Sequence, residues 1–291
     1  MIIKNFWGEK LNKYLTIILF AFMATAVSAQ TPDSLKNIWE PSLTVGLGLN
    51  QAAFSNWVKG GENSIAWSVF EDFKLNLDGD VWSFKNQIKA AYGRAKIGSE
   101  TYKTTDNDFY MEDVASYNVG WAVSPFFSNS IRTQVAKGYD YKKPDAPNIS
   151  DVFDPGYVTQ TIGFTYDKYK PVITRLGIGF QEVFTNKFTQ YTDDPATLNE
   201  VEKFKFETGI ESVTDLKYTL DTNIKYGFKL RLFSRFESLD VWDVRWDNVI
   251  TAKVNSWLSV NFTYLLIYEK DQSPYTQTKQ TLQIGIVYTL L

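Results

Sequence analysis

The sequence of 291 residues contains neither cysteine nor histidine. Without cysteine no disulfide bond can hold the chain together, so a large hydrogen-bonded framework must do so. Without histidine, the usual general base for a catalytic serine is missing, and zinc or copper sites built on histidine or cysteine are excluded. We therefore expect no enzymatic activity, no metal centre and no cofactor.

Signals for phosphate and nucleic-acid binding are also missing. The sequence holds no GxxxxGK[ST] motif and no GxGxxG segment between a strand and a helix. The formal net charge is −3, and no basic patch or known module supports a nucleic-acid partner. The acidic residues Asp193, Asp194 and Glu200 leave a calcium site open as the alternative to a solvated loop.

Long apolar runs are confined to the N-terminus. A positive flank (Lys4, Lys10 and Lys13) precedes the apolar stretch 15–27, and small residues lead up to Ala29. This stretch is shorter than the roughly 20 residues that a spanning helix needs, so it is typical of a cleaved signal peptide. We expect a signal peptide at 1–29, a short periplasmic segment at 30–40 and a single membrane domain at 41–291.

Apolar and polar residues alternate along the rest of the chain. Between Tyr218 and Leu232 every second residue is apolar, aromatic or threonine, and the intervening residues are charged, polar or glycine. A period of two indicates a strand with one apolar face and one polar face. The same alternation predicts strands near 41–55, 63–77, 80–97, 108–124, 127–141, 156–168, 172–186, 203–220, 223–237, 242–254, 257–268 and 277–291.

The predicted connections alternate between short and long. Short turns are expected at Asp78-Gly79, Ser124-Pro125 and Asn255-Ser256, whereas glycine, proline and aspartate fill the longer connections. A secreted β-sandwich also alternates along its strands, but it lacks this rhythm and has shorter strands. We expect an all-β fold: a transmembrane, antiparallel, up-and-down barrel of about twelve strands with both termini in the periplasm.

Aromatic residues near the strand ends fit a membrane barrel. Trp prefers the depth of the lipid headgroups, so two rows of Trp are expected to mark the two interfaces. The row on the short-turn side consists of Trp82, Trp121 and Trp257, and that on the long-loop side of Trp57, Trp242 and Trp246.

The polar faces of the strands should line the lumen. Both signs of charge occur there, with bases in excess: Asp72, Lys74, Lys85, Lys89, Glu112, Arg132, Arg175, Lys205, Glu207, Glu211, Lys225, Lys229, Arg231, Arg235, Asp243, Arg245, Asp247 and Lys253. One interpretation is a network of ion pairs that fills a narrow interior. The other is a small channel whose basic residues favour anionic solutes.

The last strand carries a possible recognition signal for the machinery that inserts barrels. Gln283, Gly285, Tyr288 and Leu290 place a polar residue, a glycine and two hydrophobic residues at the spacing of such signals. We expect the barrel-insertion machinery and outer-membrane lipid to be partners of the chain.

A distinctive loop motif follows the first predicted strand, with Trp57, Gly60, Gly61, Glu62 and Asn63 at its centre. Glycine pairs permit positive φ, so this segment is expected to turn tightly outside the membrane. It is either a simple turn anchored by its tryptophan or a loop that contacts a ligand or partner.

This motif, with residues 54–55 before it, resembles an uncharacterised family of Bacteroidota outer-membrane proteins, domain of unknown function family 3078. Segments 209–213, 229–234 and 244–248 support the resemblance. The resemblance implies a barrel in the outer membrane of a Gram-negative bacterium and implies no activity.

Two functions remain open at this point. The chain is expected to be a narrow or plugged barrel that acts as a structural or accessory component of an outer-membrane assembly, with a complex partner. The alternative is a porin-like channel for small solutes with a basic lumen.

Overall fold

The structure is a computed structural model that describes residues 37–55, 61–169, 171–194, 197, 200–270 and 272–289. The predicted signal peptide, most of the periplasmic segment, Trp57, Gly60 and Leu290 lie outside these residues. Within them, no helix is long and apolar enough to cross a membrane.

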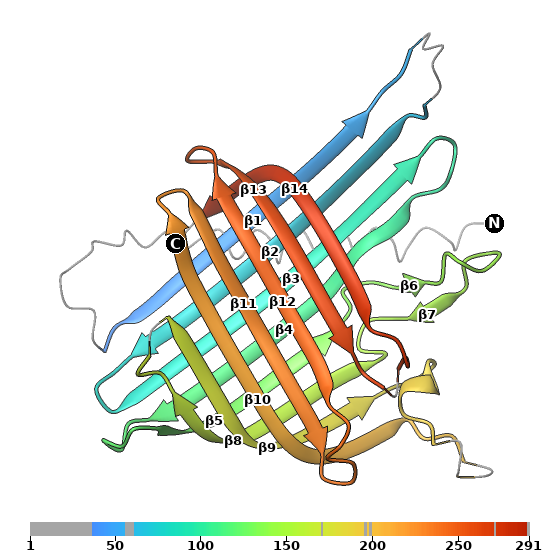
Figure 1. Cartoon of the computed structure of the whole chain (residues 1–291). Coiled ribbons are helices and arrows are strands. Elements are labelled where there is room, and N and C mark those ends of the chain that lie inside the picture. The colour runs from blue at the N-terminus through green and yellow to red at the C-terminus, as the bar shows by residue number, and fades with distance from the viewer. Residues whose placement is uncertain are drawn as a thin grey trace, which may run out of the picture. The chain divides into compact units, whose positions relative to one another are not determined.

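Twelve long strands make up most of the described chain (Figure 1). They are β1 (Trp39–Ala52), β2 (Ser64–Asp78), β3 (Trp82–Ile97), β4 (Lys103–Tyr117), β5 (Ser124–Thr133), β8 (Gly156–Tyr166), β9 (Val172–Phe184), β10 (Phe204–Asp221), β11 (Ile224–Arg235), β12 (Asp243–Lys253), β13 (Leu258–Tyr268) and β14 (Gln277–Thr289). The short strands β6 (Gly138–Tyr139) and β7 (Asn148–Ser150) form a separate hairpin, and η2 (Thr189–Tyr191) is a 3-10 turn.

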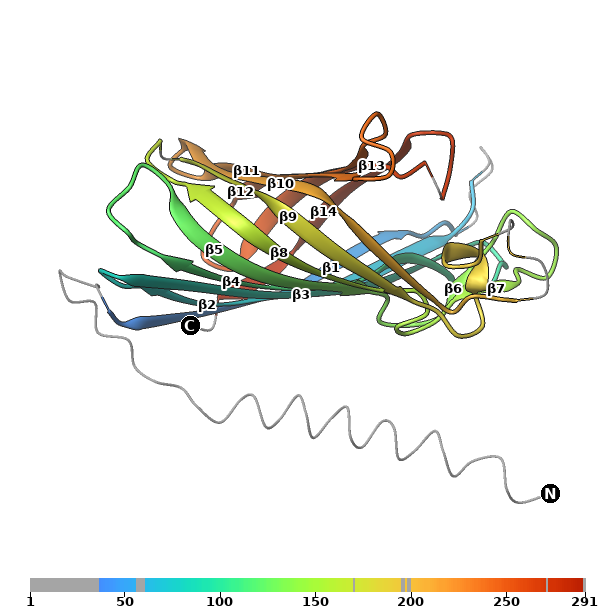
Figure 2. The ribbon, with the colours of Figure 1, turned by 90° about the horizontal axis from the view of Figure 1, so that it is seen from below.

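The twelve long strands close into one antiparallel barrel. Each strand pairs with its neighbours in sequence, and β1 pairs with β14 to close the ring (Figure 2). Closure satisfies the hydrogen-bonding groups that an open sheet would leave at its two edges. The predicted all-β, up-and-down, twelve-stranded barrel is therefore confirmed.

Two of the predicted strand positions are wrong. The strand predicted at 108–124 is β4, which ends at Tyr117, and the strand predicted at 127–141 is β5, which ends at Thr133. The Asn118 side chain accepts a hydrogen bond from the Gly120 amide at 3.0 Å, which stabilises a turn before residue 124. Ser124 and Pro125, predicted to form that turn, instead begin β5.

The end of β5 has its own physical cause. The Asn107 side-chain oxygen accepts hydrogen bonds from the amides of Val135 and Ala136, at 3.0 and 2.9 Å. These amides therefore do not pair with a neighbouring strand of the barrel, and the chain continues into the hairpin β6–β7.

The predicted alternation of short and long connections also fails once, because the short-side connection 118–123 is longer than the long-side loop 98–102.

The inward faces of the strands are mostly polar and their outward faces are mostly apolar. Among the described residues, fully buried polar or charged side chains outnumber buried hydrophobic ones, and Leu282 and Ile162 on the outer face are 68% and 59% exposed. A water-soluble protein rarely exposes a broad apolar band. A closed barrel with this distribution of side chains is suited to a bilayer.

Among the described residues, the closing seam is the shortest pairing in the ring. There β1 pairs with β2 from Trp39 to Ala52 and with β14 from Thr44 to Gly48. At the seam Gly285 faces Gly48, and a Cβ atom on Gly285 would lie 2.4 Å from the Leu47 carbonyl oxygen. Glycine therefore permits the close approach that completes the barrel.

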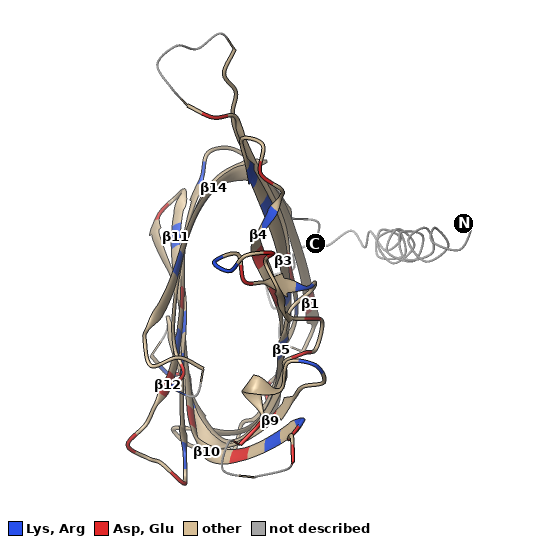
Figure 3. Cartoon of the chain, turned by 90° about the vertical axis from the view of Figure 1, so that its right-hand side faces the viewer, with Lys and Arg blue, Asp and Glu red and all other residues tan. Residues whose placement is uncertain are grey.

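The ring is elongated rather than circular (Figure 3). Strands β4 and β11 lie on opposite long walls, and the Lys229 and Glu112 side chains still meet across the lumen. The elongation therefore brings charged side chains from distant strands into direct contact.

Candidate functional site

Four charged side chains meet at the middle of the lumen: Glu112 of β4, Arg175 of β9, Asp215 of β10 and Lys229 of β11, hereafter the central cluster. Arg175 Nη2 lies 2.8 Å from Glu112 Oε1 and 3.2 Å from Asp215 Oδ2. Lys229 Nζ contacts Glu112 Oε2 and lies 3.6 Å from Asp215 Oδ1. The two acids and two bases balance in charge, so the cluster neutralises itself.

The central cluster spans the barrel past two intervening strands, β5 and β8. These strands direct the small side chains Ser128 and Thr161 inward. β5 also directs Phe126 inward, and the Arg175 guanidinium lies over its ring, 6.0 Å from the centroid. The Glu112, Arg175 and Lys229 side chains are only 11%, 6% and 13% exposed, so these three charges are largely shielded from water.

A second layer of polar contacts lies next to the central cluster, on its long-loop side. Arg231 Nε lies 2.6 Å from Glu211 Oε1, and Arg231 Nη2 donates to Gln181 Oε1 at 2.9 Å. The Thr161 hydroxyl donates to Glu211. A small cavity of about 20 Å³, lined partly by Arg231 and Glu211, lies at this level. That is about enough space for one water molecule.

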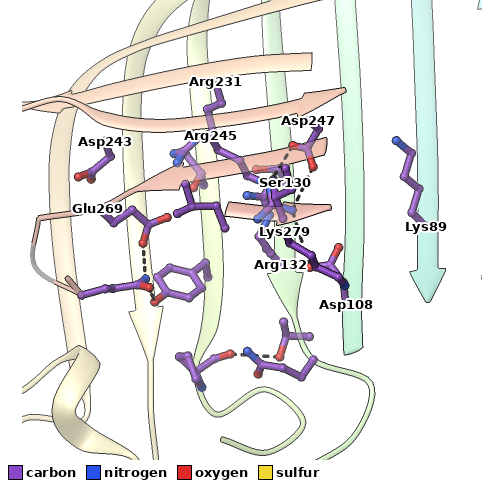
Figure 4. Close-up of a pocket in the computed structure, with 18 of the residues that line it drawn as sticks. Lys89, Asp108, Ser130, Arg132, Arg231, Asp243, Arg245, Asp247, Glu269 and Lys279 are labelled. Carbon is purple, nitrogen blue, oxygen red and sulfur yellow. Dashed lines mark hydrogen bonds and ion pairs between the residues drawn. The ribbon is translucent and has the colours of Figure 1, made fainter. Parts of the chain in front are cut away.

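Beyond this layer the lumen widens into a cavity of about 490 Å³, hereafter the vestibule (Figure 4). Its wall comes from the long-loop ends of the strands, so it opens toward the long loops. The lining includes seven basic and six acidic residues: Lys89, Arg132, Lys205, Arg231, Arg235, Arg245, Lys279, Asp106, Asp108, Glu207, Asp243, Asp247 and Glu269. The expected excess of basic residues is therefore small here.

Most of the vestibule charges are paired. Arg235 lies 2.6 Å from Glu207 and 3.0 Å from Asp243, measured between its Nε and Nη2 atoms and the nearest carboxylate oxygens. Arg245 Nε lies 3.0 Å from Asp247 Oδ2. These contacts hold the side chains against the wall of the cavity rather than across it.

Two cations of the vestibule differ from the others. Arg132 lies over the Tyr110 ring, 5.0 Å from its centroid, as in a cation–π contact. In the part of the chain that the structure describes, neither Arg132 nor Lys89 forms an ion pair. Figure 4 shows Lys89 apart from the group around Arg132 and Asp108.

The predicted lumen residues all lie on inward-facing strand positions. Lys74 pairs with Asp72 at 2.7 Å (Nζ to Oδ2), and Lys85 and Lys225 lie toward the short-turn end of the barrel. In the central cluster, the second layer and the vestibule, the structure brings together nine further predicted residues: Arg132, Arg175, Glu207, Glu211, Lys229, Arg231, Arg235, Arg245 and Asp247. Asp215 and Tyr110 are inward-facing residues that the predictions missed. Asp215 shares the parity of Glu207 and Glu211, so alternation alone could have identified it.

The tryptophans lie at two levels of the outer surface. Trp82 begins β3, and Trp121 and Trp257 lie in the turns at the same end of the barrel. Trp242 and Trp246 lie at the start of β12, at the opposite end, and all five side chains are exposed. Trp39, at the short-turn end of β1, is also exposed and was not predicted.

The outer loops hold polar contacts. The Asn63 side-chain oxygen accepts a hydrogen bond from the Phe54 amide at 2.7 Å, which closes the loop that contains Gly61 and Glu62. Hydrogen bonds from the Thr197 hydroxyl and the Asp194 amide lower the pKa of Glu202 to about 2. Within the described ranges, no group of three acidic, histidine or cysteine residues could hold a metal ion.

The comparisons with known proteins agree with a barrel of unassigned role. The model of the family described as "Protein of unknown function (DUF3078)" matches residues 49–139. The predicted resemblance to this family is thereby supported in the N-terminal part of the barrel. The segments 209–213, 229–234 and 244–248 lie outside the match, and no curated protein matches the sequence.

Several solved structures are similar over most of their length. They include the translocator domain of the autotransporter NalP from Neisseria meningitidis, with a TM-score of 0.38, 9% identity and coverage of 95% of this chain and 97% of that chain. An outer membrane channel from Pseudomonas putida F1 gives a TM-score of 0.36 with 8% identity, covering 90% of this chain and 99% of that chain. The β domain of the Bordetella autotransporter BrkA gives 0.31 with 8% identity, covering 86% and 98%. At such low identities and TM-scores these likenesses carry no information on function.

Proposed function

We propose that this chain is an outer-membrane barrel with a closed lumen, and that it acts as a structural or accessory component of an outer-membrane assembly. The observation that carries the proposal is the central cluster. Its contacts from Glu112 to Arg175 and Lys229 join β4 to β9 and β11 across the lumen. On this proposal, a passing solute would have to separate these side chains.

Burial makes that separation costly. Removing one partner of a buried ion pair typically costs about 3–5 kcal/mol, because the remaining charge is left without compensation. The Glu112 carboxylate has two cationic partners, and all three side chains are largely shielded from water. These contacts therefore support a lumen that stays closed without a further signal.

The second candidate function is a small-solute channel. The vestibule favours it, because the cavity of about 490 Å³ holds two cations without an acidic partner among the described residues, Lys89 and Arg132. Such cations would attract anionic solutes by their positive potential. This function requires the central cluster to open, which makes it the less favoured of the two.

Two measurements on the purified full chain separate these functions. We expect no conductance steps in a planar bilayer, and a stoichiometric partner after extraction in mild detergent, identified by mass spectrometry. Stable steps with anion selectivity, from a chain that is extracted without a partner, would contradict the proposal and support the channel.

The cellular location is part of the same proposal. We infer export by the signal peptide, insertion through the signal around Gln283, Gly285 and Tyr288, and residence in the outer membrane of a Gram-negative bacterium, one of the Bacteroidota. The alternation of long loops at one end of the barrel with mostly short turns at the other supports a periplasmic location for both termini.

Cysteine labelling of intact cells tests this orientation, since the natural chain has no cysteine. Single cysteines at Gly61, Asp151 or Asp194 should react with a membrane-impermeant maleimide. Single cysteines at Asp78 or Ser256 should react only after the cells are broken. The reverse pattern would contradict the proposed orientation.

A further inference from the structure

Four polar side chains form a continuous row on the outer surface of the barrel: Asn86 of β3, Asp113 of β4, Asn129 of β5 and Gln160 of β8, hereafter the outer polar row. The strand register places Asn86 opposite Asp113, Asp113 opposite Asn129, and Asn129 opposite Gln160. These four strands follow one another around the wall (Figure 1). The row therefore crosses four neighbouring strands without interruption.

The parity of each strand places these side chains outside. On β4 the adjacent residue Glu112 reaches Arg175 inside the lumen, so Asp113 points to the opposite face. On β8 Thr161 contacts Glu211 inside the lumen, which directs Gln160 outward. Asn86 and Asn129 are register partners of Asp113, and register partners share a face of the sheet.

The row lies within the apolar band rather than at its edge. Asn86 follows the exposed Trp82 by four residues on β3, a distance of about 13 Å along a strand. The apolar band of a membrane barrel is about 25 Å tall. On the same outer face the row is bordered by Phe84, Ile88, Met111, Ala115, Phe127, Ile131, Val158 and Ile162.

Contacts within the row leave polar groups unpaired. The Asn86 side-chain nitrogen donates to Asp113 Oδ1 at 2.7 Å, and the Gln160 side-chain nitrogen lies 3.4 Å from Asn129 Oδ1. Among the described residues, the second oxygen of Asp113 and the side-chain nitrogen of Asn129 have no partner. Lipid tails offer none either, and an unpaired polar group in lipid carries a free-energy cost.

We propose that the outer polar row is the contact surface for a second copy of this chain, in a dimer whose two-fold axis runs along the membrane normal. Such an axis keeps depth unchanged and reverses the lateral order of the row. Because the strands of a membrane barrel are tilted by about 35–45°, the row is inclined to the membrane plane, and only its two central residues, next to the axis, come face to face. The Asn129 amide of one copy then faces the partner's Asp113, and the same contact repeats on the other side of the axis. The free donor of Asn129 thus meets the free acceptor of Asp113, in a charge-assisted hydrogen bond.

The composition of the row favours a second copy over an unrelated protein. Amide side chains both donate and accept hydrogen bonds, so the central Asn129 of one copy complements the central Asp113 of a second copy. The exposed Phe127 and Ile162 beside the row add apolar contact area. A different protein would need its own polar row at the same depth.

The dimer is independent of the proposed function, because it forms through the outer face whether or not the lumen is closed. Cross-linking therefore tests it separately from conductance. Ala115 and Phe127 are register partners next to the row on β4 and β5, close to the expected two-fold axis. A cysteine at Ala115 would be the only cysteine in the chain.

In native membranes, we expect Ala115→Cys to give a covalent dimer of the chain with a short thiol cross-linker. The matched control is Leu282→Cys on β14, which is equally outward-facing but lies away from the row. This control should remain monomeric. Cross-linking of both cysteines to the same extent would indicate random collision and contradict the proposal.

A second variant removes the row without harming the barrel. In the Ala115→Cys chain, Asp113→Leu with Asn129→Leu should weaken dimerisation about tenfold or more, because two hydrogen bonds across the axis are lost. Leucine is well suited to lipid, so the strand content measured by circular dichroism should stay unchanged. Gln280→Leu, which removes an outward amide on β14, is the control and should leave dimerisation intact.

Three results would overturn the proposal. The Ala115→Cys chain could remain monomeric in membranes that contain the folded barrel. It could cross-link to a protein of a different mass, which would identify the row as the contact surface for an unrelated partner. The leucine variant could cross-link as well as its parent.

Discussion

The central cluster and the mouth of the vestibule use the same chemistry in different surroundings. At the mouth, Lys279 of β14 lies 2.6 Å from Asp106 of β4 (Nζ to Oδ1), and these side chains are 43% and 22% exposed. In the central cluster, Arg175 lies 2.8 Å from Glu112, and these side chains are 6% and 11% exposed. Both pairs join distant strands, but only the pair of the central cluster is shielded from water.

The distance between two charges therefore does not determine how much an ion pair contributes to stability. Water screens an exposed pair, and its contribution to stability is typically about 0–1 kcal/mol. A buried pair depends on its partner, because water no longer compensates either charge. The two regions should therefore respond very differently to the loss of one charge.

The largest effect is expected for Glu112→Ala. This change leaves Arg175 and Lys229 near each other and without the carboxylate that they share. We expect the free energy of unfolding to fall by about 3–5 kcal/mol. Denaturant unfolding of the refolded barrel in detergent or lipid measures it, and a loss below about 1 kcal/mol would remove the distinction between the two regions.

An intermediate effect is expected for Glu211→Gln, which removes one charge from the second layer. Arg231 would keep its hydrogen bond to Gln181 at 2.9 Å, and the new amide could still accept a hydrogen bond from Thr161. The charge-assisted part of the Arg231 contact is lost, so we expect a decrease of about 1.5–3 kcal/mol in the free energy of unfolding. The same unfolding assay measures it. A loss as large as that of Glu112→Ala would contradict the expectation that the second layer contributes less stability than the central cluster.

The smallest effect is expected for Lys279→Ala at the mouth. The exposed pair with Asp106 should contribute less than about 1 kcal/mol, and added salt should reduce even that. Unfolding at low and high salt concentration provides the measurement. A loss comparable to that of Glu112→Ala would contradict the expectation that water screens the Lys279–Asp106 pair.

The amino-acid pattern predicts the barrel well because alternation is a local property. The residues of each strand alone show which side chains share a face. This is enough to predict the number of strands and the inward position of residues such as Arg175 and Lys229. The failures are local as well. The side chains of Asn118 and Asn107 set the ends of β4 and β5, and neither hydrogen bond follows from a period of two.

Contacts across the lumen could not be predicted in this way. Glu112 lies 63 residues from Arg175 and 117 from Lys229 in sequence. Their contact depends on the elongated ring, which brings the facing walls of the barrel close together (Figure 3). The outer polar row could not be predicted from the sequence for a related reason. Each residue of the row has apolar outward neighbours two positions away on its own strand, and only the register joins these isolated polar residues into a row.

The conductance of a paired variant tests the central claim most directly. Glu112→Ser with Lys229→Ser removes one acid and one base, and leaves the Arg175–Asp215 pair at 3.2 Å (Nη2 to Oδ2) to compensate itself. We predict that the parent barrel and Lys279→Ala are silent in a planar bilayer, whereas the paired variant shows stable conductance steps. Equal conductance of the parent and the paired variant would contradict closure of the lumen by the central cluster.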